Sequence, residues 1–333
     1  MVEVCSLILF LYMRITYIDR LKGLAMILVV MGHLILVSFK NPVGNPLFAV
    51  CETTEMMLFS FLSGFVVKKM SFEKVIKKLP QLLLPMLTIG ILYTYYSGRQ
   101  WRDFVNSPFK CGYWYFLFLA YCYFCLSTIE KCNIAFKKVW QRVLQDVAWL
   151  VFFSLLVFLL RHLLHLSWNT DWLSLSVFYS FWPYFMLGYL FRKYNLVNYL
   201  EDCNLIFSFT LLLYIPFVIL YCKQGHVFMH LAALCAIIVL LFVFQKREKD
   251  SSYAESFLGY IGKSSIDVYL FHFFLLNAIN LSMVGKWFDL TNNYFVEFLV
   301  VLSIAILVSS LCVFIARVFH KSNMLNVVVY GHF

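Results

Sequence analysis

The stretch YIDRLKGLAMILVVMGHLIL, residues 17–36, decides the fold of this chain. Charged residues open it, and an apolar run long enough for a transmembrane helix follows. His33 lies well inside that run, where a titratable side chain is costly and usually faces a bundle interior or a water-filled cavity. Lys22 and His33 are eleven residues apart, which is close to three helical turns and about 16 Å of rise. The two side chains therefore lie on nearly one helix face, with His33 the deeper.

The rest of the chain repeats this apolar pattern. Of its 333 residues 62% are hydrophobic and 13% charged, and the mean hydropathy is +0.81. Soluble domains are about 45–50% apolar and about 25% charged. The apolar residues come in blocks of about 20 that do not alternate with polar ones, which favours helices over an outer-membrane barrel. We expect an all-α polytopic membrane protein with about ten spans, near residues 21–39, 47–67, 79–97, 113–129, 145–163, 172–191, 205–222, 226–244, 257–282 and 294–316.

The basic residues predict the orientation of these spans. With the N-terminus in the cytoplasm, 20 of the 27 Lys and Arg residues fall on the cytoplasmic side and seven on the other. Because cytoplasmic loops carry the excess of Lys and Arg, this split predicts that both termini are cytoplasmic. The net charge of +10 is then explained by topology, and no nucleic-acid partner is expected.

The spans form a single predicted domain. Residues 14–320 are expected to make one transmembrane domain, followed by a short cytoplasmic tail at 321–333. Residues 1–13 are interpreted as a doubtful N-terminal extension. They contain an apolar run with Glu3, but no basic segment before it and no small-residue cleavage site, so a signal peptide is not expected.

Several segments, in order, resemble one family of membrane enzymes. The stretch DRLKGLAMILVVMGH, residues 19–33, resembles the opening of the membrane-bound acyltransferase-3 family, mainly bacterial enzymes that O-acylate glycans outside the cytoplasm. The resemblance covers roughly residues 14–320. It continues in FSFLSGF at 59–65, KKMSFEKVIKKLP at 68–80, YWYFLFL at 113–119, YFMLGYLFRKY at 184–194 and IGKSSIDVYLFH at 261–272.

The resemblance implies a site and a donor. A basic residue, ten intervening residues and a histidine are the family's catalytic signature, which makes His33 the catalytic residue and Lys22 a residue that binds the donor or positions charge. The implied donor is acetyl-CoA or another acyl-CoA, with no further cofactor. The donor- or substrate-binding residues would be Asp19, Lys22, Ser63, Gly64, Lys74, Lys77, Lys78, Trp114 and His272.

Two positions depart from the family pattern. Lys74 and Lys77, followed by Lys78, stand where the family usually has an Arg-x-x-Arg pair; lysine attracts phosphate without bidentate hydrogen bonds. These lysines have an equal explanation in positive-inside topology.

Glu55 stands where many relatives have histidine, at a depth similar to that of His33. We hypothesise that Glu55 is catalytic and orients His33 or stabilises its imidazolium, the alternative being a carboxylate in an outward-facing vestibule.

Together these features predict a membrane O-acyltransferase, most readily an O-acetyltransferase, in the bacterial inner membrane. The acyl group would pass from cytoplasmic acyl-CoA to a hydroxyl of a cell-surface polysaccharide or lipid-linked glycan. His33 would act as a general base or form an acyl-histidine, and the sequence does not separate these routes. The alternatives are a proton-coupled transporter or flippase that uses His33, Glu52 and Glu55, and a non-catalytic sensor or scaffold. No metal site is expected, and the oligomeric state stays open.

Overall fold

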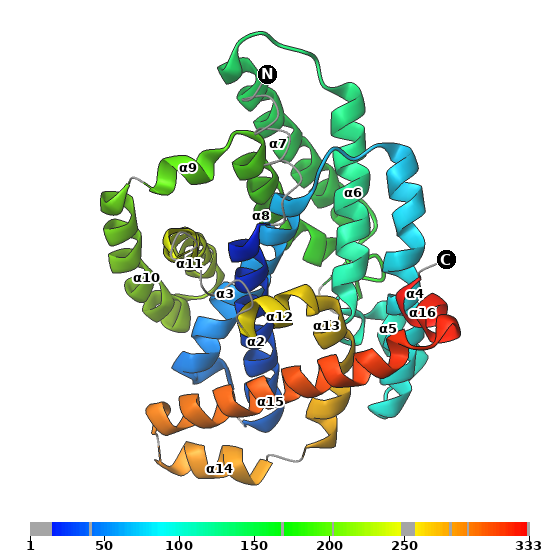
Figure 1. Ribbon diagram of the computed structural model, residues 1–333, viewed down its shortest axis with the longest axis vertical. Helices are drawn as coiled ribbons and strands as arrows, with labels where there is room; N and C mark the ends of the chain where they lie inside the picture. Colours follow the sequence, from blue (N-terminus) through cyan, green and yellow to red (C-terminus); the bar gives the residue numbers. More distant parts are fainter. Residues whose placement is uncertain are drawn as a thin grey trace.

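The structure, a computed structural model, is a bundle of helices (Figure 1). It describes residues 15–39, 42–167, 170–201, 203–247, 257–279, 282–291 and 293–331, and the extension expected at 1–13 lies outside them. These residues form no β-strand, only an isolated bridge between Ser167 and Thr170. In chain order the helices are α2 (Thr16–Ser38), η1 (Pro42–Gly44), α3 (Pro46–Val66), α4 (Phe72–Tyr96), α5 (Trp101–Asn106), η2 (Lys110–Gly112), α6 (Trp114–Cys132), α7 (Val139–Leu163), α8 (Leu175–Lys193), α9 (Leu196–Glu201), α10 (Asn204–Gln224), α11 (His226–Lys246), α12 (Phe257–Lys263), α13 (Ser265–Ala278), α14 (Ser282–Thr291), α15 (Tyr294–His320) and α16 (Asn323–Tyr330).

Seven of the described helices are long and apolar enough to cross a membrane: α2, α3, α4, α7, α10, α11 and α15. Each coincides with a span expected from the sequence, so the all-helical, multi-pass class is confirmed. The helices at three other expected spans are not both long and apolar enough to meet the same criterion. Helices α6 and α8 have 19 residues each and carry many Tyr, Trp and Ser side chains. The span expected at 257–282 is broken at Ser264 into the short helices α12 and α13. The count of ten and the cytoplasmic termini therefore stay predictions.

Helices α2 and α3 form the centre of the bundle. In their apolar windows 61% and 78% of the residues are buried, against 17% and 11% in α7 and α10. Figure 1 shows α2 and α3 in the middle, α10 and α11 on one side, and α4 and α6 on the other. Helix α2 contacts α3, α11, α12, α13, α14 and α15. A titratable residue on α2 or α3 is therefore surrounded by protein.

Glycines allow the central helices to cross closely. A Cβ on Gly64 of α3 would lie 1.8 Å from the carbonyl oxygen of Phe185, and one on Gly188 of α8 would lie 1.9 Å from that of Phe61. Small residues that let backbones approach are typical of helix pairs in membranes. Gly64, expected at the site, therefore lies at the crossing of α3 and α8.

The predicted tail contains a docked helix. Helix α16 contacts α4 and α15. The side chain of Ser322 caps its start by accepting a hydrogen bond from the backbone N–H of Leu325. Tyr330, at its last turn, is buried. The C-terminal segment thus belongs to the bundle up to Gly331.

Candidate active site

His33 is oriented by its own helix. Its Nδ1 lies 2.7 Å from the carbonyl oxygen of Val29, one turn earlier on α2. A carbonyl only accepts hydrogen bonds, so this contact requires the proton on Nδ1 and leaves the lone pair on Nε2. The side chain is partly buried. His33 therefore presents a hydrogen-bond acceptor that is suited to take a proton.

A second histidine lies directly beside it. The rings of His33 and His272 have centroids 5.4 Å apart and meet edge to face, and the ring of Phe273 lies 4.6 Å from His33. The Nδ1 of His272 lies 2.9 Å and 3.0 Å from the carbonyl oxygens of Val268 and Tyr269. Its Nε2 is buried and has no hydrogen-bond partner in the described part of the chain. Two imidazoles with the same tautomer thus meet between α2 and α13.

Glu55 lies at the level of this pair, on α3. A Cβ on Gly32 would lie 2.6 Å from Glu55 Oε2, so the absence of a side chain next to His33 makes the room that Glu55 occupies. Within the described residues, Glu55 Oε2 is buried without a hydrogen-bond partner, and no hydrogen bond joins Glu55 to His33. The Val29 carbonyl already occupies the Nδ1 position that an orienting carboxylate would take.

A cavity of about 240 Å³ lies next to the histidine pair, toward the N-terminal ends of α2 and α13. We call the part lined by Lys22 near the start of α2, Lys78 near the start of α4 and Tyr330 at the end of α16 the cationic end, and the part lined by Phe59, Tyr115 and Tyr269 the aromatic end. At the cationic end the Lys78 Nζ lies 5.1 Å from the centre of the Tyr123 ring. The complete lining is Lys22, Phe59, Ser63, Val66, Lys78, Gln81, Leu82, Pro85, Tyr115, Phe116, Leu119, Tyr123, Ser265, Ile266, Tyr269 and Tyr330.

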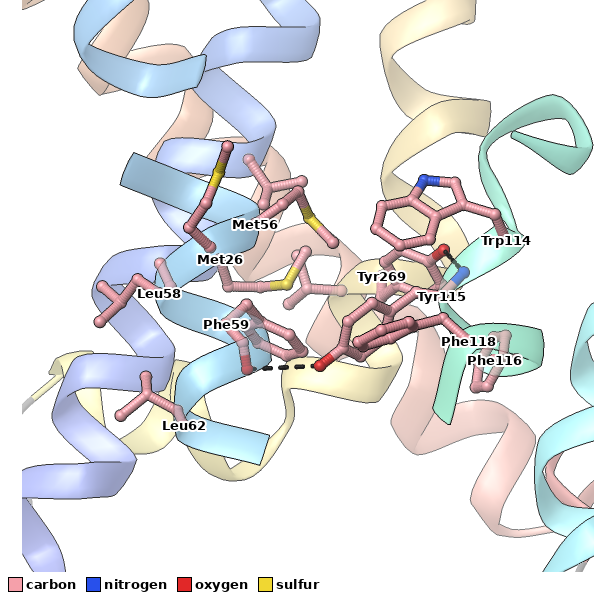
Figure 2. Packing of buried hydrophobic residues seen from close by; sticks show 14 of the residues in the cluster. Met26, Met56, Leu58, Phe59, Leu62, Trp114, Tyr115, Phe116, Phe118 and Tyr269 are labelled. Atoms are coloured by element: carbon pink, nitrogen blue, oxygen red, sulfur yellow. Dashed lines mark hydrogen bonds between the residues drawn. The ribbon is translucent and has the colours of Figure 1, made fainter. Parts of the chain in front are cut away.

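Hydroxyl groups hold the aromatic end together. Tyr115 Oη donates to Ser63 Oγ at 2.7 Å and lies 3.3 Å from the carbonyl oxygen of Phe59. Tyr269 Oη donates to the carbonyl oxygen of Gly112 at 2.6 Å and accepts from the backbone N–H of Tyr115 at 3.2 Å. Figure 2 shows Phe59, Tyr115 and Tyr269 converging from three helices.

The cationic end is bordered by the C-terminal helix. Tyr330 Oη donates to Asp267 Oδ1 at 2.8 Å, and His320 Nε2 lies 3.2 Å from the same oxygen. Burial and the neighbouring Asp267 raise the pKa of the Tyr330 hydroxyl, so it stays a hydrogen-bond donor at neutral pH. This network links α13, α15 and α16 beside the cavity.

The structure gathers some of the predicted residues and separates others. Lys22, Ser63 and Lys78 line the cavity, and His33, His272 and Glu55 lie above it. Lys74 and Lys77 are exposed on α4, where the Lys74 Nζ donates to the Lys69 carbonyl oxygen at 3.1 Å.

Two further predicted residues lie away from the cavity. Trp114 is buried against Phe181, with ring centroids 4.9 Å apart, and does not line the cavity. Asp19 is buried at the start of α2, next to Gly262 of α12.

Sequence reasoning missed the aromatic residues that line the cavity and contact His33. Phe273 contacts His33, and the cavity is lined by Phe59, Tyr115, Phe116, Tyr123, Tyr269 and Tyr330. In a chain that is 20% aromatic, tyrosines inside apolar segments have the pattern of packing residues. No signal in one sequence separates them from the many aromatic residues that only pack.

The fold and the site together define a polytopic membrane protein with a histidine pair above a lysine-lined cavity. Among the described residues, no group of three or more His, Cys, Asp and Glu side chains could hold a metal ion. The family model of the acyltransferase-3 acyltransferase domain matches residues 15–314, so the chain belongs to this family. By family and by its apolar helices it is a membrane acyltransferase. No curated protein and no solved structure matches the chain.

Proposed function

We propose that this protein transfers an acyl group, most readily acetyl, from acyl-CoA to a hydroxyl of a cell-surface polysaccharide or lipid-linked glycan. The observation that carries the proposal is the cavity, which is lined by Lys22 and Lys78 and also by Tyr269, about one helical turn before His272. A donor with anionic phosphates and a reactive arm would have its phosphates at the lysines and its arm toward the histidines.

The donor would be held by charge at one end and by packing along its arm. Ammonium groups attract phosphate as point charges, without the bidentate geometry of arginine. Lys22 and Lys78 lie at the cavity, and the exposed Lys74 and Lys77 extend the positive charge over the start of α4. The phosphates of coenzyme A would lie on these lysines, and the pantetheine arm would enter between the aromatic side chains.

His33 supplies the group that the reaction requires. The acceptor hydroxyl oxygen attacks the thioester carbonyl carbon, so that a C–O bond forms and the C–S bond breaks. The hydroxyl proton passes to His33 Nε2, which has its lone pair because Nδ1 contacts the Val29 carbonyl. The same proton then goes to the departing thiolate, which leaves as free coenzyme A. In the alternative route Nε2 attacks the thioester carbonyl carbon and the C–S bond breaks, which gives an acyl-histidine and the thiolate of coenzyme A. The acceptor hydroxyl oxygen then attacks the acyl carbon, the C–N bond breaks, and the hydroxyl proton ends on the thiolate.

In the predicted topology the two substrates would approach from opposite sides of the membrane. The distribution of Lys and Arg supports an orientation in which the lysine end of the cavity faces the cytoplasm, where acyl-CoA is made. His33 lies beyond mid-membrane in the same frame, so the glycan hydroxyl would approach from the outer side. We infer residence in the inner membrane of a bacterial cell.

The test compares surface glycans from a deletion strain complemented with wild type, with His33→Ala or with His162→Ala. His162 is exposed at the end of α7 and serves as the matched control. Loss of a general base lowers the rate about 10²–10⁴-fold. We expect wild type and His162→Ala to restore an alkali-labile acyl mass increment and His33→Ala to leave it absent at equal protein level. Restoration by His33→Ala would overturn the mechanism.

A transporter or flippase is the second candidate, and Glu55 is the observation that favours it. An intramembrane carboxylate commonly marks a proton pathway, and within the described residues Glu55 Oε2 has no hydrogen-bond partner. Reconstituted protein that moves a lipid-linked glycan without cleaving acetyl-CoA would support transport. Cleavage that depends on His33, without such movement, would exclude it.

A further inference from the structure

Three aromatic rings that line the cavity contact one another in series, and one of them, Tyr269, also lies 6.1 Å from the ring of His272. Phe59 of α3, Tyr115 of α6 and Tyr269 of α13 all line the cavity. The ring centroids of Phe59 and Tyr115 are 5.1 Å apart, and those of Tyr115 and Tyr269 are 6.0 Å apart. The Tyr115 ring meets each of the other two edge to face, and Figure 2 shows the three side chains together between their helices. We call them the aromatic wall.

The aromatic wall lies one turn below the residues of the proposed chemistry. Tyr269 precedes His272 by three residues on α13, which is about 4.5 Å of helix rise. Phe59 follows Glu55 by four residues on α3, or about 6 Å, and Glu55 lies at the level of Gly32. In helix register the wall is therefore the part of the cavity lining that comes within about one turn of the histidine pair.

The members of the wall are held unequally. The hydroxyl of Tyr115 is bound to Ser63, and that of Tyr269 to the Gly112 carbonyl. Phe59 has no polar atom in its side chain and is held by packing alone, with 9% of its surface exposed. An aromatic side chain held by packing changes rotamer more readily than one tied by a hydrogen bond. Phe59 is thus the side chain of the wall that changes rotamer most readily.

We propose that the aromatic wall limits the length of the acyl chain that the protein accepts, with Phe59 as its main specificity-determining residue. This rests on the proposed function, in which the donor lies with its phosphates at the lysine end of the cavity and its acyl end toward the wall. Acetyl adds one methyl group beyond the thioester carbonyl. Each further methylene must displace rings that already pack closely, and interior packing leaves little room for added volume.

Binding of non-reactive donors tests the proposal without a known acceptor. The probes are free coenzyme A and its S-ethyl, S-butyl and S-hexyl thioethers, titrated into wild type, Phe59→Ala and Phe153→Ala in lipid nanodiscs. Phe153 is buried on α7, where its ring contacts Trp149, Phe152 and Trp182 and no member of the wall, so it is the matched control. One methylene is worth about 10–200-fold in a tight apolar pocket.

We expect wild type and Phe153→Ala to bind S-ethyl-CoA well and S-hexyl-CoA at least about tenfold more weakly. In Phe59→Ala the affinities for S-ethyl-CoA and S-hexyl-CoA should lie within a few fold of each other. Equal affinity of wild type for all chain lengths would overturn the length limit while leaving the donor intact. Failure of wild type to bind any of the probes would instead overturn the proposed function. If Phe59→Ala does not fold, Phe59→Leu and the wild-type series still decide the outcome.

Discussion

At His33, a backbone carbonyl does what a carboxylate does in many histidine-based sites. The Val29 oxygen fixes the tautomer and the ring orientation, because an imidazole N–H can reach the carbonyl one helical turn earlier. In the described part of the chain Glu55 makes no hydrogen bond to His33, and its catalytic role stays a prediction. Its Oε2 instead fills the space beside Gly32, where it can influence the charge that develops on His33.

Replacement of Gly32 by alanine tests this arrangement. The added Cβ would lie 2.6 Å from Glu55 Oε2, so the carboxylate must move. Overpacking of this kind costs about 1–3 kcal/mol of stability. We expect Gly32→Ala to lower the midpoint of thermal unfolding in detergent, and Glu55→Ala in the same chain to recover most of the loss. Strictly additive effects in this double-mutant cycle would show that the two residues do not meet.

At the scale of the element, two glycine crossings hold the site helices. Gly64 and Gly188 bring α3 against α8, and Gly23 and Gly262 bring α2 against α12, with every added Cβ within 2 Å of a backbone oxygen. Backbone atoms cannot turn aside as side chains do, so any larger residue must separate the helices. The position of Glu55 and Ser63 on α3 thus depends on contacts of a neighbouring helix.

Gly64→Ala should disturb folding more than a larger addition of volume on the exposed face of α7. Because its Cβ would meet the Phe185 oxygen at 1.8 Å, we expect a loss of stability of about 1–3 kcal/mol or more. Ala148→Val on the exposed face of α7 is the control and should be close to neutral. Thermal unfolding followed by size-exclusion recovery measures both. A wild-type midpoint for Gly64→Ala would contradict the close crossing.

At the scale of the whole molecule, the direction of the bundle decides which substrate meets which end of the site. The network of Asp267, His320 and Tyr330 joins the C-terminal helix to the cavity beside Lys22 and Lys78. If the termini are cytoplasmic, this end receives the donor. The reverse orientation would expose the lysines to the outside and remove the basis for a cytoplasmic donor.

Two native cysteines report that direction. Cys132, at the end of α6, and Cys222, near the end of α10, are exposed and lie on opposite sides in the predicted topology. In variants that retain one or the other, a membrane-impermeant maleimide should label Cys222 in intact spheroplasts and Cys132 only after permeabilisation. The opposite pattern, or labelling of both from one side, would contradict the predicted orientation.

The sequence by itself determined the class of the protein and which residues of its first span share a helix face. Blocks of apolar residues must form helices in lipid because backbone groups have no water to bind. The spacing of Lys22 and His33 sets their common face through helix geometry alone. The family match over residues 15–314 confirms the acyltransferase resemblance carried by these local segments.

Only the tertiary structure decided what surrounds His33. His272 comes from α13, far along the chain, and Glu55 proved to face Gly32 without a hydrogen bond to His33. The cavity arises where α2, α3, α4, α6, α13 and α16 fail to fill the space between them. Such a space depends on how helices distant in sequence pack, and helical periodicity does not specify that packing.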